Sequence, residues 1–254
     1  MSNNAPDDEL EQHDAQSLAE GYSPLVRFTE VASVMVFLAG EGWLAYRVWP
    51  HGHMHAWWVW LLAGLGAYIF ADFISGLFHW MGDTWGSPDM PILGKVFVRP
   101  FREHHVDQLA ITRHDFLEIN GANCLIALPP LAMLHFIPLT SSFGVLAAGF
   151  FGVFLFWIFL TNQFHMWAHI EHRPKLVIWA QKYHLILPKE HHQIHHAAPY
   201  LKYYCITNGW LNAPLHHLRF FRISERIISA ITGLVPREDD IGEVAARKIA
   251  PSKT

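Results

Sequence analysis

The chain has 254 residues, of which 52% are hydrophobic and only 16% are charged, and its formal net charge is -4 at pH 7. Soluble domains usually carry about 25% charged residues, so this deficit points to a membrane protein. A mildly acidic balance gives no reason to expect a nucleic-acid partner, because such a partner needs a basic surface. The 19 histidines outnumber the 18 lysines and arginines together, which makes histidine the residue type to follow.

The two ends of the chain are polar, and the region between them is predicted to be one membrane domain. The N-terminal stretch is acidic and lacks the basic start of a secretory signal or the arginine-rich character of a transit peptide. We therefore expect a disordered acidic tail over 1–24, a membrane domain over 25–243 and a flexible tail over 244–254. Cys124 and Cys205 lie in unlike surroundings and are not expected to pair, which favours a reducing compartment.

Four apolar stretches are candidates for membrane spans. They are residues 31–49, 57–77, 124–139 and 143–164. A helix needs about 20 apolar residues to cross the hydrocarbon layer, so the first, second and fourth stretches are predicted to span. The third is short and contains Pro129, Pro130 and Pro138, so it is either a kinked span or a re-entrant hairpin with the fourth. The fold class is therefore all-α, an integral membrane protein with about four transmembrane helices.

Basic residues predict how these spans are oriented. Arg47 is the one basic residue between the first two spans, whereas the loop 80–121 contains four, and most of the others follow the fourth span. Four spans then place both termini and the 80–121 loop on the cytoplasmic side. The membrane would be the inner membrane of a bacterium or the endoplasmic reticulum of a eukaryote.

Eight histidines form four clusters at the predicted cytoplasmic ends of the spans, where they make a histidine-rich cap. They are His79, His104, His105, His165, His169, His192, His195 and His196. Imidazole is the commonest metal ligand near neutral pH, and eight nitrogens exceed what one four-coordinate zinc requires. The clusters suit two metal ions, and nitrogen ligands favour iron, zinc or copper.

The spacing within two clusters predicts which residues share a metal. His165 and His169 stand one helical turn apart, which suits a shared metal but also occurs in ordinary packed helices. His192, His195 and His196 stand at i, i+3 and i+4 and lie on one face of a predicted helix. Three imidazoles on one face are costly to bury without partners, so this cluster is the stronger signal.

Two further features concern how the ligands are arranged and supported. His104 and His105 point about 100° apart on a helix, which favours two different metals. Asp72 and Asp83 flank the histidine that ends the second span, and a carboxylate at a membrane boundary predicts function. Such a carboxylate either ligates a metal or supports a ligating histidine from behind, and we favour the supporting role. His184 is close enough to the last cluster to be a spare ligand or a proton carrier.

The remaining sequence offers few other signals. Residues 218–235 place isoleucine and leucine among arginines at helical spacing, which predicts a basic amphipathic helix that lies in the lipid interface or packs on the cap. No glycine fingerprint for a nucleotide follows a strand pattern, and no Gly-x-Ser-x-Gly elbow is present. Two irons separated by a bridging oxygen can use O2 to attack an unactivated C–H bond, and electrons would then come from a separate protein.

Several motifs resemble the Kua family of lipid desaturases. They are Asp72–Gly86 (DFISGLFHWMGDTWG), Phe101–His105 (FREHH), Ile111–Phe116 (ITRHDF), Leu187–His196 (LPKEHHQIHH) and Tyr204–Asn212 (YCITNGWLN). The last two together resemble the plasmanylethanolamine desaturase branch more than the plant phosphatidylglycerol desaturase branch. The resemblance runs from about residue 25 to 243.

This resemblance implies an O2-dependent desaturase in which the eight histidines hold two iron ions. It also implies two electrons supplied by cytochrome b5 or an equivalent carrier. The branch implies a membrane phospholipid substrate, plasmanylethanolamine, whose sn-1 O-alkyl chain loses two hydrogens at C1–C2 to give the vinyl ether of a plasmalogen. The alternatives are a related lipid hydroxylase, an acyl-chain desaturase or, outside the enzymes, a bis-histidine haem protein that carries electrons.

Overall fold

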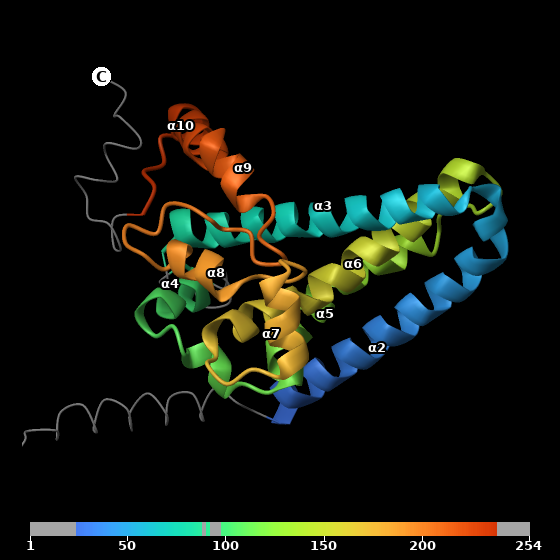
Figure 1. Ribbon diagram of the computed structural model, residues 1–254, viewed down its shortest axis with the longest axis horizontal. Coiled ribbons are helices and arrows are strands. Elements are labelled where there is room, and N and C mark those ends of the chain that lie inside the picture. The colour runs from blue at the N-terminus through green and yellow to red at the C-terminus, as the bar shows by residue number, and fades with distance from the viewer. Residues whose placement is uncertain (1–23, 88–89, 92–97, 238–254) are drawn as a thin grey trace, which may run out of the picture.

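The computed structural model describes residues 24–87, 90–91 and 98–237, and the regular structure in these ranges is helical (Figure 1). The tails expected over 1–24 and 244–254 lie outside the described residues, apart from Pro24, which begins the first helix. Cys124 and Cys205 are both buried and free, as predicted.

Four long helices form an elongated bundle. They are α2 (Pro24–Val48), α3 (Trp57–Thr84), α5 (Phe116–Leu134) and α6 (Ser142–His169), with the short 3-10 helix η1 (Trp49–Met54) linking the first two. All four are long and apolar enough to cross a membrane, η1 being counted with α2. The prediction of an all-α membrane protein with four spans is therefore confirmed.

The third span differs from its predicted limits, since it begins at Phe116 rather than at residue 124. Asp115 caps it by accepting hydrogen bonds from the backbone N–H groups of Leu117 and Glu118, while the Glu118 side chain accepts one from the Asp115 N–H. This reciprocal capping box satisfies the first N–H groups of the helix. Pro129 and Pro130 lie inside the helix without ending it.

Polar side chains in the first half of α5 form hydrogen bonds with side chains of α6. The Asn120 amide donates to the Gln163 side chain over 3.3 Å, and the Asn162 amide donates to the Asn123 side chain over 3.1 Å. Such amide pairs hold membrane helices together because hydrocarbon offers them no other partner. They explain how the polar residues before position 124 belong to the span.

Helix α6 is the centre of the bundle, since it packs against α2, α3 and α5. The core between α2, α5 and α6 includes buried Phe37, Leu131, Val145 and Phe159. Large apolar side chains also point outward along the helices. They include Met35, Leu61, Ile126 and Phe143, each more than half exposed. A face of this kind suits lipid.

One end of the bundle carries tryptophans and the other carries the histidines. Trp49, Trp57 and Trp58 are exposed around η1, as in the aromatic belt at a membrane–water interface. An apolar cavity of about 780 Å³ lies at this end between α2, α3 and α6, with Glu41 in its wall. Helices α4 (Arg99–Val106) and α8 (Lys189–His195), which carry predicted metal ligands, lie at the opposite end of the bundle from the connection between α2 and α3 (Figure 1).

Helices α3 and α6 are longer than a bilayer requires. Each has 28 residues, which is roughly 42 Å at about 1.5 Å per residue, whereas the hydrocarbon layer is about 30 Å thick. The last two turns of α3 carry His79 and Asp83, and those of α6 carry His165 and His169. The surplus length lets these side chains lie at the membrane surface rather than in hydrocarbon.

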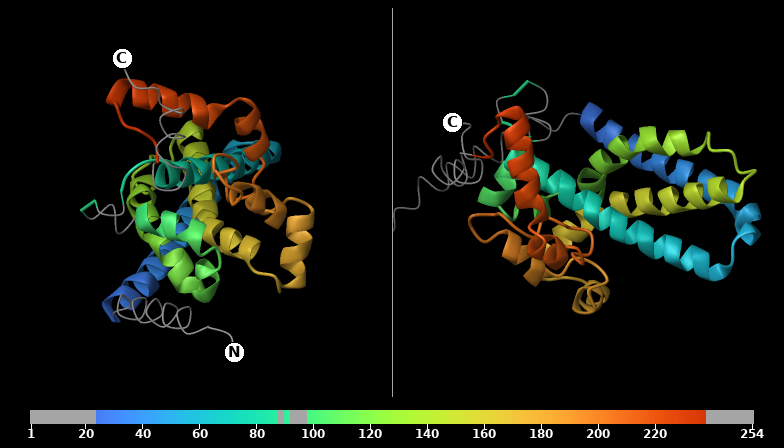
Figure 2. Two further views of the ribbon diagram at one scale, coloured as in Figure 1. Left: turned by 90° about the vertical axis from the view of Figure 1, so that its left-hand side faces the viewer. Right: turned by 90° about the horizontal axis from the view of Figure 1, so that it is seen from above.

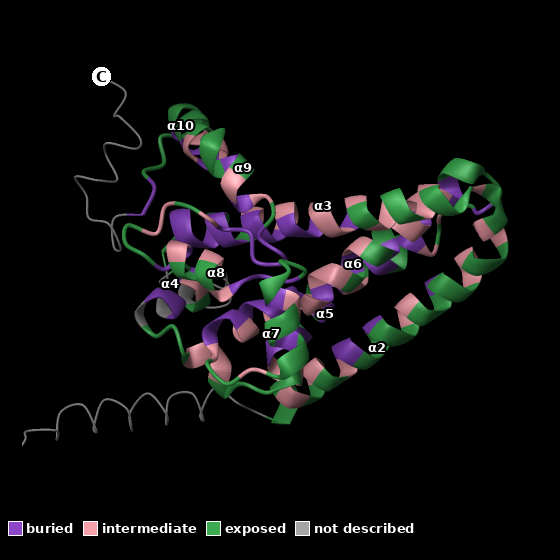
Figure 3. Ribbon diagram, viewed as in Figure 1, coloured by how far each residue is buried: buried purple, intermediate pink, exposed green. Residues whose placement is uncertain are grey.

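The remaining elements form a cap on this end. They are α4 (Arg99–Val106), η3 (Ala110–Arg113), α7 (Lys175–Lys182), α8 (Lys189–His195), α9 (Asn212–His217) and α10 (Phe220–Thr232). Helix α10 is the amphipathic helix predicted over 218–235. It lies across the end of the bundle, and its axis runs at a steep angle to the axis of α3 (Figure 2). Burial is concentrated where α3, α4, α6 and α8 meet (Figure 3).

Candidate metal centre

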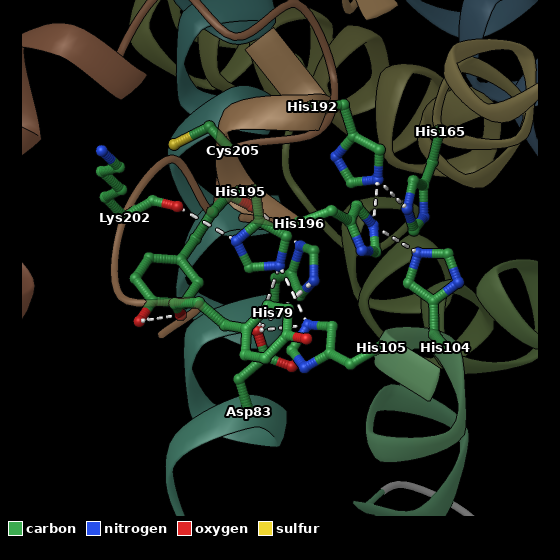
Figure 4. A network of polar contacts seen from close by, with 12 residues as sticks. His79, Asp83, His104, His105, His165, His192, His195, His196, Lys202 and Cys205 are labelled. Carbon is green, nitrogen blue, oxygen red and sulfur yellow. Dashed lines mark hydrogen bonds and ion pairs between the residues drawn. The ribbon is translucent and has the colours of Figure 1, made fainter. Parts of the chain in front are cut away.

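The eight predicted histidines converge from α3, α4, α6 and the α8 segment into two adjacent groups (Figure 4). The five-histidine group consists of His104, His165, His169, His192 and His196, and the Asp83 group consists of His79, Asp83, His105 and His195. In each group the ligand atoms all lie within 4.8 Å of one another. The clusters therefore share one end of the bundle, as predicted, and form two candidate metal sites.

The ring nitrogens of the five-histidine group are too close together to be explained by hydrogen bonds alone. The Nε2 atom of His192 lies 2.8 Å from that of His165, 2.7 Å from that of His169 and 2.9 Å from that of His196. In a neutral imidazole each ring nitrogen has either one proton or one lone pair. The Nε2 atom of His192 therefore cannot form hydrogen bonds with three other Nε2 atoms at once. Metal–nitrogen bonds of about 2.0–2.1 Å at right angles separate neighbouring nitrogens by roughly 2.9 Å, which fits the observed spacing.

The electrostatics of this group also favour metal binding. Burial, and then the neighbouring imidazoles, hold the pKa of His104, His192 and His196 below the usual histidine value. These rings are therefore neutral at pH 7. A histidine must be neutral to offer a lone pair to a metal, so no proton has to be displaced.

The Asp83 group places one carboxylate among three imidazoles. Asp83 Oδ2 lies 3.5 Å from His79 Nε2, 3.5 Å from His105 Nε2 and 3.4 Å from His195 Nε2. Asp83 is fully buried, and neither of its carboxylate oxygens has a hydrogen-bond partner among the described residues. The nearest described cation is the Arg237 guanidinium, 3.7 Å from Asp83 Oδ2, which is too far for a hydrogen bond. A metal ion at the centre of these four groups would compensate the buried carboxylate directly.

Asp83 thus stands where a ligand would stand, whereas the sequence favoured a supporting role for it. The reason is its position one turn beyond His79, which puts both side chains on the same face of α3. The separation of His104 and His105 into different groups agrees with the prediction for adjacent helical residues. His165 and His169 share a group, also as predicted.

Backbone carbonyls fix the orientation of two rings in the Asp83 group. His79 Nδ1 lies 3.1 Å from the Tyr204 carbonyl, and His195 Nδ1 lies 3.0 Å from the Lys202 carbonyl. A carbonyl can only accept, so each ring donates its proton from Nδ1 and presents the Nε2 lone pair to the centre. The tautomer that metal binding requires is therefore set by the fold.

The segment that supplies these carbonyls is held in an unusual conformation. Tyr200 and Tyr203 have left-handed backbones, with φ of 58° and 65°. A left-handed backbone at a residue other than glycine costs about 1–2 kcal/mol, so surrounding contacts must hold it. One such contact is the Tyr200 ring, which stacks on His105 with centroids 4.5 Å apart and planes 8° apart. Another is the Tyr204 hydroxyl, which donates to the Tyr200 carbonyl over 3.1 Å.

Asp72 anchors the chain just beyond this segment instead of contacting either metal group. Its Oδ1 accepts hydrogen bonds from the backbone N–H groups of Thr207, Asn208 and Gly209 at 3.2, 2.9 and 2.8 Å, and its Oδ2 accepts one from Leu211 at 3.1 Å. This fully buried carboxylate organises a whole turn of backbone. No interaction between Asp72 and a grouped histidine is seen among the described residues.

The same stretch of chain lies tightly against α3. A Cβ atom at Gly76 would be 2.5 Å from Cys205 Sγ and 3.3 Å from the Cys205 Cα, so only glycine permits this approach. The Ser75 hydroxyl accepts a hydrogen bond from the Ile206 N–H over 3.1 Å. These contacts, together with Asp72, place the carbonyl of Tyr204 against His79.

His184 is not brought into either metal group. Its ring contacts His191 with centroids 5.2 Å apart, and its carbonyl accepts a hydrogen bond from the Trp210 indole over 2.6 Å. Its backbone is left-handed, with φ of 54°. The residue therefore ends α7, where the N–H groups of His184 and Leu185 donate to the carbonyls of Gln181 and Ala180, and its role here is structural.

Sequence reasoning missed three residues that support the centre. Arg237 donates from Nε to the backbone carbonyl of Asp83, and its Nη2 lies 3.7 Å from Asp83 Oδ2. Tyr204 and Lys202 act through their backbone carbonyls. No local pattern marks Arg237, because its partner lies far away in the sequence. Tyr204 opens one of the family motifs, but its contact, like that of Lys202, is made by the backbone carbonyl, which no residue type signals.

The packing of the rings argues against haem. The rings of His104 and His169 meet edge to face with centroids 4.5 Å apart, and those of His165 and His192 do so at 4.4 Å. A bis-histidine haem needs two imidazoles on opposite faces of a flat macrocycle. Rings in direct contact leave no space for one between them.

We expect Asp83→Asn to lose the metal of its group while the five-histidine group keeps its own. The change preserves shape but removes the charge that offsets a dication, so the metal content should fall from about two ions per chain to about one. Metal analysis of the purified protein measures this. Asp107→Asn is the matched control, because Asp107 is half exposed and pairs with Arg113 outside both groups. Full metal content in Asp83→Asn would return Asp83 to a supporting role.

Comparison with known proteins agrees with this geometry. A model of the lipid desaturase domain matches residues 68–239. The chain is 52% identical to a plasmanylethanolamine desaturase of Myxococcus xanthus over 94% of this chain and 85% of that protein. It is 44% identical to plasmanylethanolamine desaturase 1 of Mus musculus over 89% of this chain and 86% of that protein. It is 35% identical to the chloroplastic fatty acid desaturase 4 of Arabidopsis thaliana over 69% of this chain and 54% of that protein. No solved structure matches.

Proposed function

Because the chain belongs to the lipid desaturase family and is an oxidoreductase of the desaturase class, we propose that it is a di-iron plasmanylethanolamine desaturase. Its reaction introduces the vinyl-ether double bond at C1–C2 of the sn-1 O-alkyl chain. The observation that carries this proposal is the similarity to two plasmanylethanolamine desaturases over nearly the whole chain, together with nine buried metal donors in two groups.

The proposed reaction balances as a four-electron reduction of O2. The O–CH2–CH2 unit of the alkyl chain gives up two hydrogens and becomes O–CH=CH. These two hydrogens, two electrons from an external carrier and two protons from solvent reduce one O2 to two waters. The chain has no nucleotide fingerprint, so cytochrome b5 or an equivalent protein delivers the electrons one at a time.

The two groups would each hold one iron. The iron pair supplies the activation of O2 that an unactivated C–H bond requires. The protein's part is to keep the Nε2 lone pairs aimed inward, which the carbonyls of Tyr204 and Lys202 do for His79 and His195. It also excludes water, since the side chains of His79, His192 and His195 are at most 1% exposed. A dry site protects a strong oxidant from side reactions.

The histidine end of the bundle faces the cytoplasm in this proposal. Support comes from the distribution of basic residues, which favours the loop 80–121 and the chain after α6. The ether oxygen of a phospholipid lies near the membrane surface, close to the head group. Ligands in the last two turns of α3 and α6 are at that depth, so C1 and C2 need not leave the bilayer.

We expect expression in a host that makes ether lipids but no plasmalogens to produce vinyl ethers. Lipid mass spectrometry should record a loss of two mass units on the sn-1 alkyl chain of the ethanolamine lipids. A gain of one oxygen would instead identify a hydroxylase, and loss of two mass units on an acyl chain would identify an acyl-chain desaturase. His169→Ala, expressed at the same level, is the control that should yield no product.

A further inference from the structure

A basic pocket of about 680 Å³ lies beside the metal centre. It is formed by the segment 197–202, by the end of α9 and by the first half of α10. Its cationic side chains are Lys202, Arg219, Arg222 and Arg226, and His216 and His217 also line it. None of its described lining residues is acidic. A concave surface with four cationic side chains, of which only Arg222 has an ion pair among the described residues, with Glu225, suits an anion.

Two features of this pocket supply hydrogen-bond donors for such an anion. Arg222 donates from Nη2 to the Tyr204 hydroxyl over 3.2 Å and also to Glu225, but its buried Nε and Nη1 have no partner in the part of the chain that the structure describes. Helix α10 begins here after Arg219, whose side chain does not cap it. The free N–H groups and positive dipole of a helix start attract anions.

The faces of α10 place this pocket at the membrane surface. Ile223, Ile227 and Ile231 follow one another at every fourth residue and are 49%, 53% and 75% exposed. The opposite face, with Phe221 and Glu225, is buried against the cap. Between these two faces lie Arg219, Arg222 and Arg226. An apolar stripe bordered by arginines is typical of a helix in the lipid interface, where the arginines reach the phosphate level.

The pocket is also within reach of the metal centre. Ala197 and Ala198 in its wall directly follow the candidate ligand His196, and the Lys202 carbonyl accepts the hydrogen bond of His195. In a phospholipid, C1 of the sn-1 alkyl chain and the phosphorus at sn-3 are six bonds apart, a reach of at most about 9 Å at about 1.5 Å per bond. The shared segment 195–202 thus joins the pocket to the metal centre, and a single lipid is the ligand that would need both.

We propose that this pocket binds the phosphodiester of the substrate's head group and so positions C1–C2 of the sn-1 chain at the metal centre, an inference that rests on the proposed function. Arg219 and Arg226 contribute charge, Arg222 contributes two buried donors, and the start of α10 contributes backbone N–H groups. An acidic electron carrier would also be attracted by these charges. The concave shape and the adjoining isoleucine stripe favour a lipid instead.

The test compares two lipids that differ in the head group alone. Iron-loaded protein in detergent, without reductant, is titrated with labelled 1-O-alkyl-2-acyl-glycerophosphoethanolamine and with the matching 1-O-alkyl-2-acylglycerol, which lacks phosphate. We expect the wild type to bind the phospholipid at least about tenfold more tightly, since charge-assisted bonds are stronger than neutral ones. Arg219→Gln/Arg226→Gln should lose about tenfold for the phospholipid and nothing for the alkylacylglycerol.

Two further variants control for folding and for total charge. Arg219→Lys/Arg226→Lys keeps the charge and should recover most of the affinity. Lys175→Gln/Lys182→Gln removes two charges from α7, outside the pocket, and should bind both lipids as the wild type does. In turnover assays the glutamine variant should raise KM for the phospholipid about tenfold and change kcat less than about twofold.

Several outcomes would overturn the head-group assignment. If the glutamine variant lost affinity equally for both lipids, or for neither, the pocket would not bind the phosphate. A raised KM for the electron carrier with unchanged lipid affinity would assign the pocket to an acidic protein. Displacement of the labelled lipid by submillimolar inorganic phosphate would make it a free-phosphate site. Head-group-dependent binding without any vinyl ether would uphold the pocket and refute the proposed reaction.

Discussion

His192→Ala should lose the iron of the five-histidine group and abolish desaturation. His192 Nε2 lies within 2.7–2.9 Å of the Nε2 atoms of His165, His169 and His196, so it is the common neighbour of the group. Its side chain is 1% exposed, which leaves a cavity in place of the ring. We expect iron to fall from about two ions per chain to about one, and vinyl-ether formation to fall on the order of 10³-fold or more, since such residues act as a unit.

The matched control for this variant is His172→Ala. His172 is exposed, follows the end of α6 and belongs to neither metal group, so its replacement should leave iron and activity unchanged. Iron is measured by metal analysis and activity by the vinyl-ether assay on the same preparation. A His192→Ala protein with two irons and normal activity would remove His192 from the ligands. Two irons without activity would give it an orienting role instead.

The sequence predicted where the histidines gather better than how they divide. The clusters lie at or after the ends of the second and the fourth span, and these two ends are on the same side of the membrane. The convergence of all four clusters at one end of the bundle therefore follows from the topology. The adjacent pair His104 and His105 was separated correctly, because neighbouring helical residues diverge by about 100°. The sequence also predicted that His192, His195 and His196 lie on one face of a helix. Because α8 runs between the two groups, His192 and His196 point into one of them and His195 into the other.

Supporting interactions were largely beyond sequence reasoning. The acceptors for His79 and His195 are backbone carbonyls, and a carbonyl gives no residue-type signal. Arg237 reaches Asp83 from the far end of the described chain, so spacing gives no hint of the contact. A usable signal did exist for Asp83, which stands at i+4 from His79. A carboxylate and an imidazole at that spacing share a helix face and can share a metal.

The third span was difficult to predict for a related reason. Its first turns contain Asn120 and Asn123, which lower the apolar character of a window that α6 in fact completes with Asn162 and Gln163. The cost of placing a polar side chain in the membrane is overestimated from one segment alone when a neighbouring helix supplies its hydrogen-bond partner. The span limits therefore depended on a tertiary contact between two helices.

Asp72→Ala should destabilise the protein more than any other change outside the metal ligands. It leaves four backbone N–H groups without an acceptor, of which those of Thr207, Asn208 and Gly209 are buried and that of Leu211 is part-buried. Each orphaned donor costs about 1–3 kcal/mol, so a loss on the order of 4 kcal/mol or more is expected. The apparent melting temperature in detergent should fall by roughly 10 °C. Thermal inactivation followed by fluorescence or by residual activity measures it.

The effect should extend from stability to the metal centre. Asp72 holds the turn that follows Cys205, and this chain carries the Tyr204 carbonyl that fixes His79. Iron in the Asp83 group should therefore be lost faster to a chelator than iron in the five-histidine group. Asp72→Asn retains one side-chain oxygen and should fall between the wild type and Asp72→Ala. Asp107→Ala removes a half-exposed carboxylate and should change stability by less than about 1 kcal/mol. Equal chelation rates at both groups would separate Asp72 from the centre and leave it a purely structural anchor.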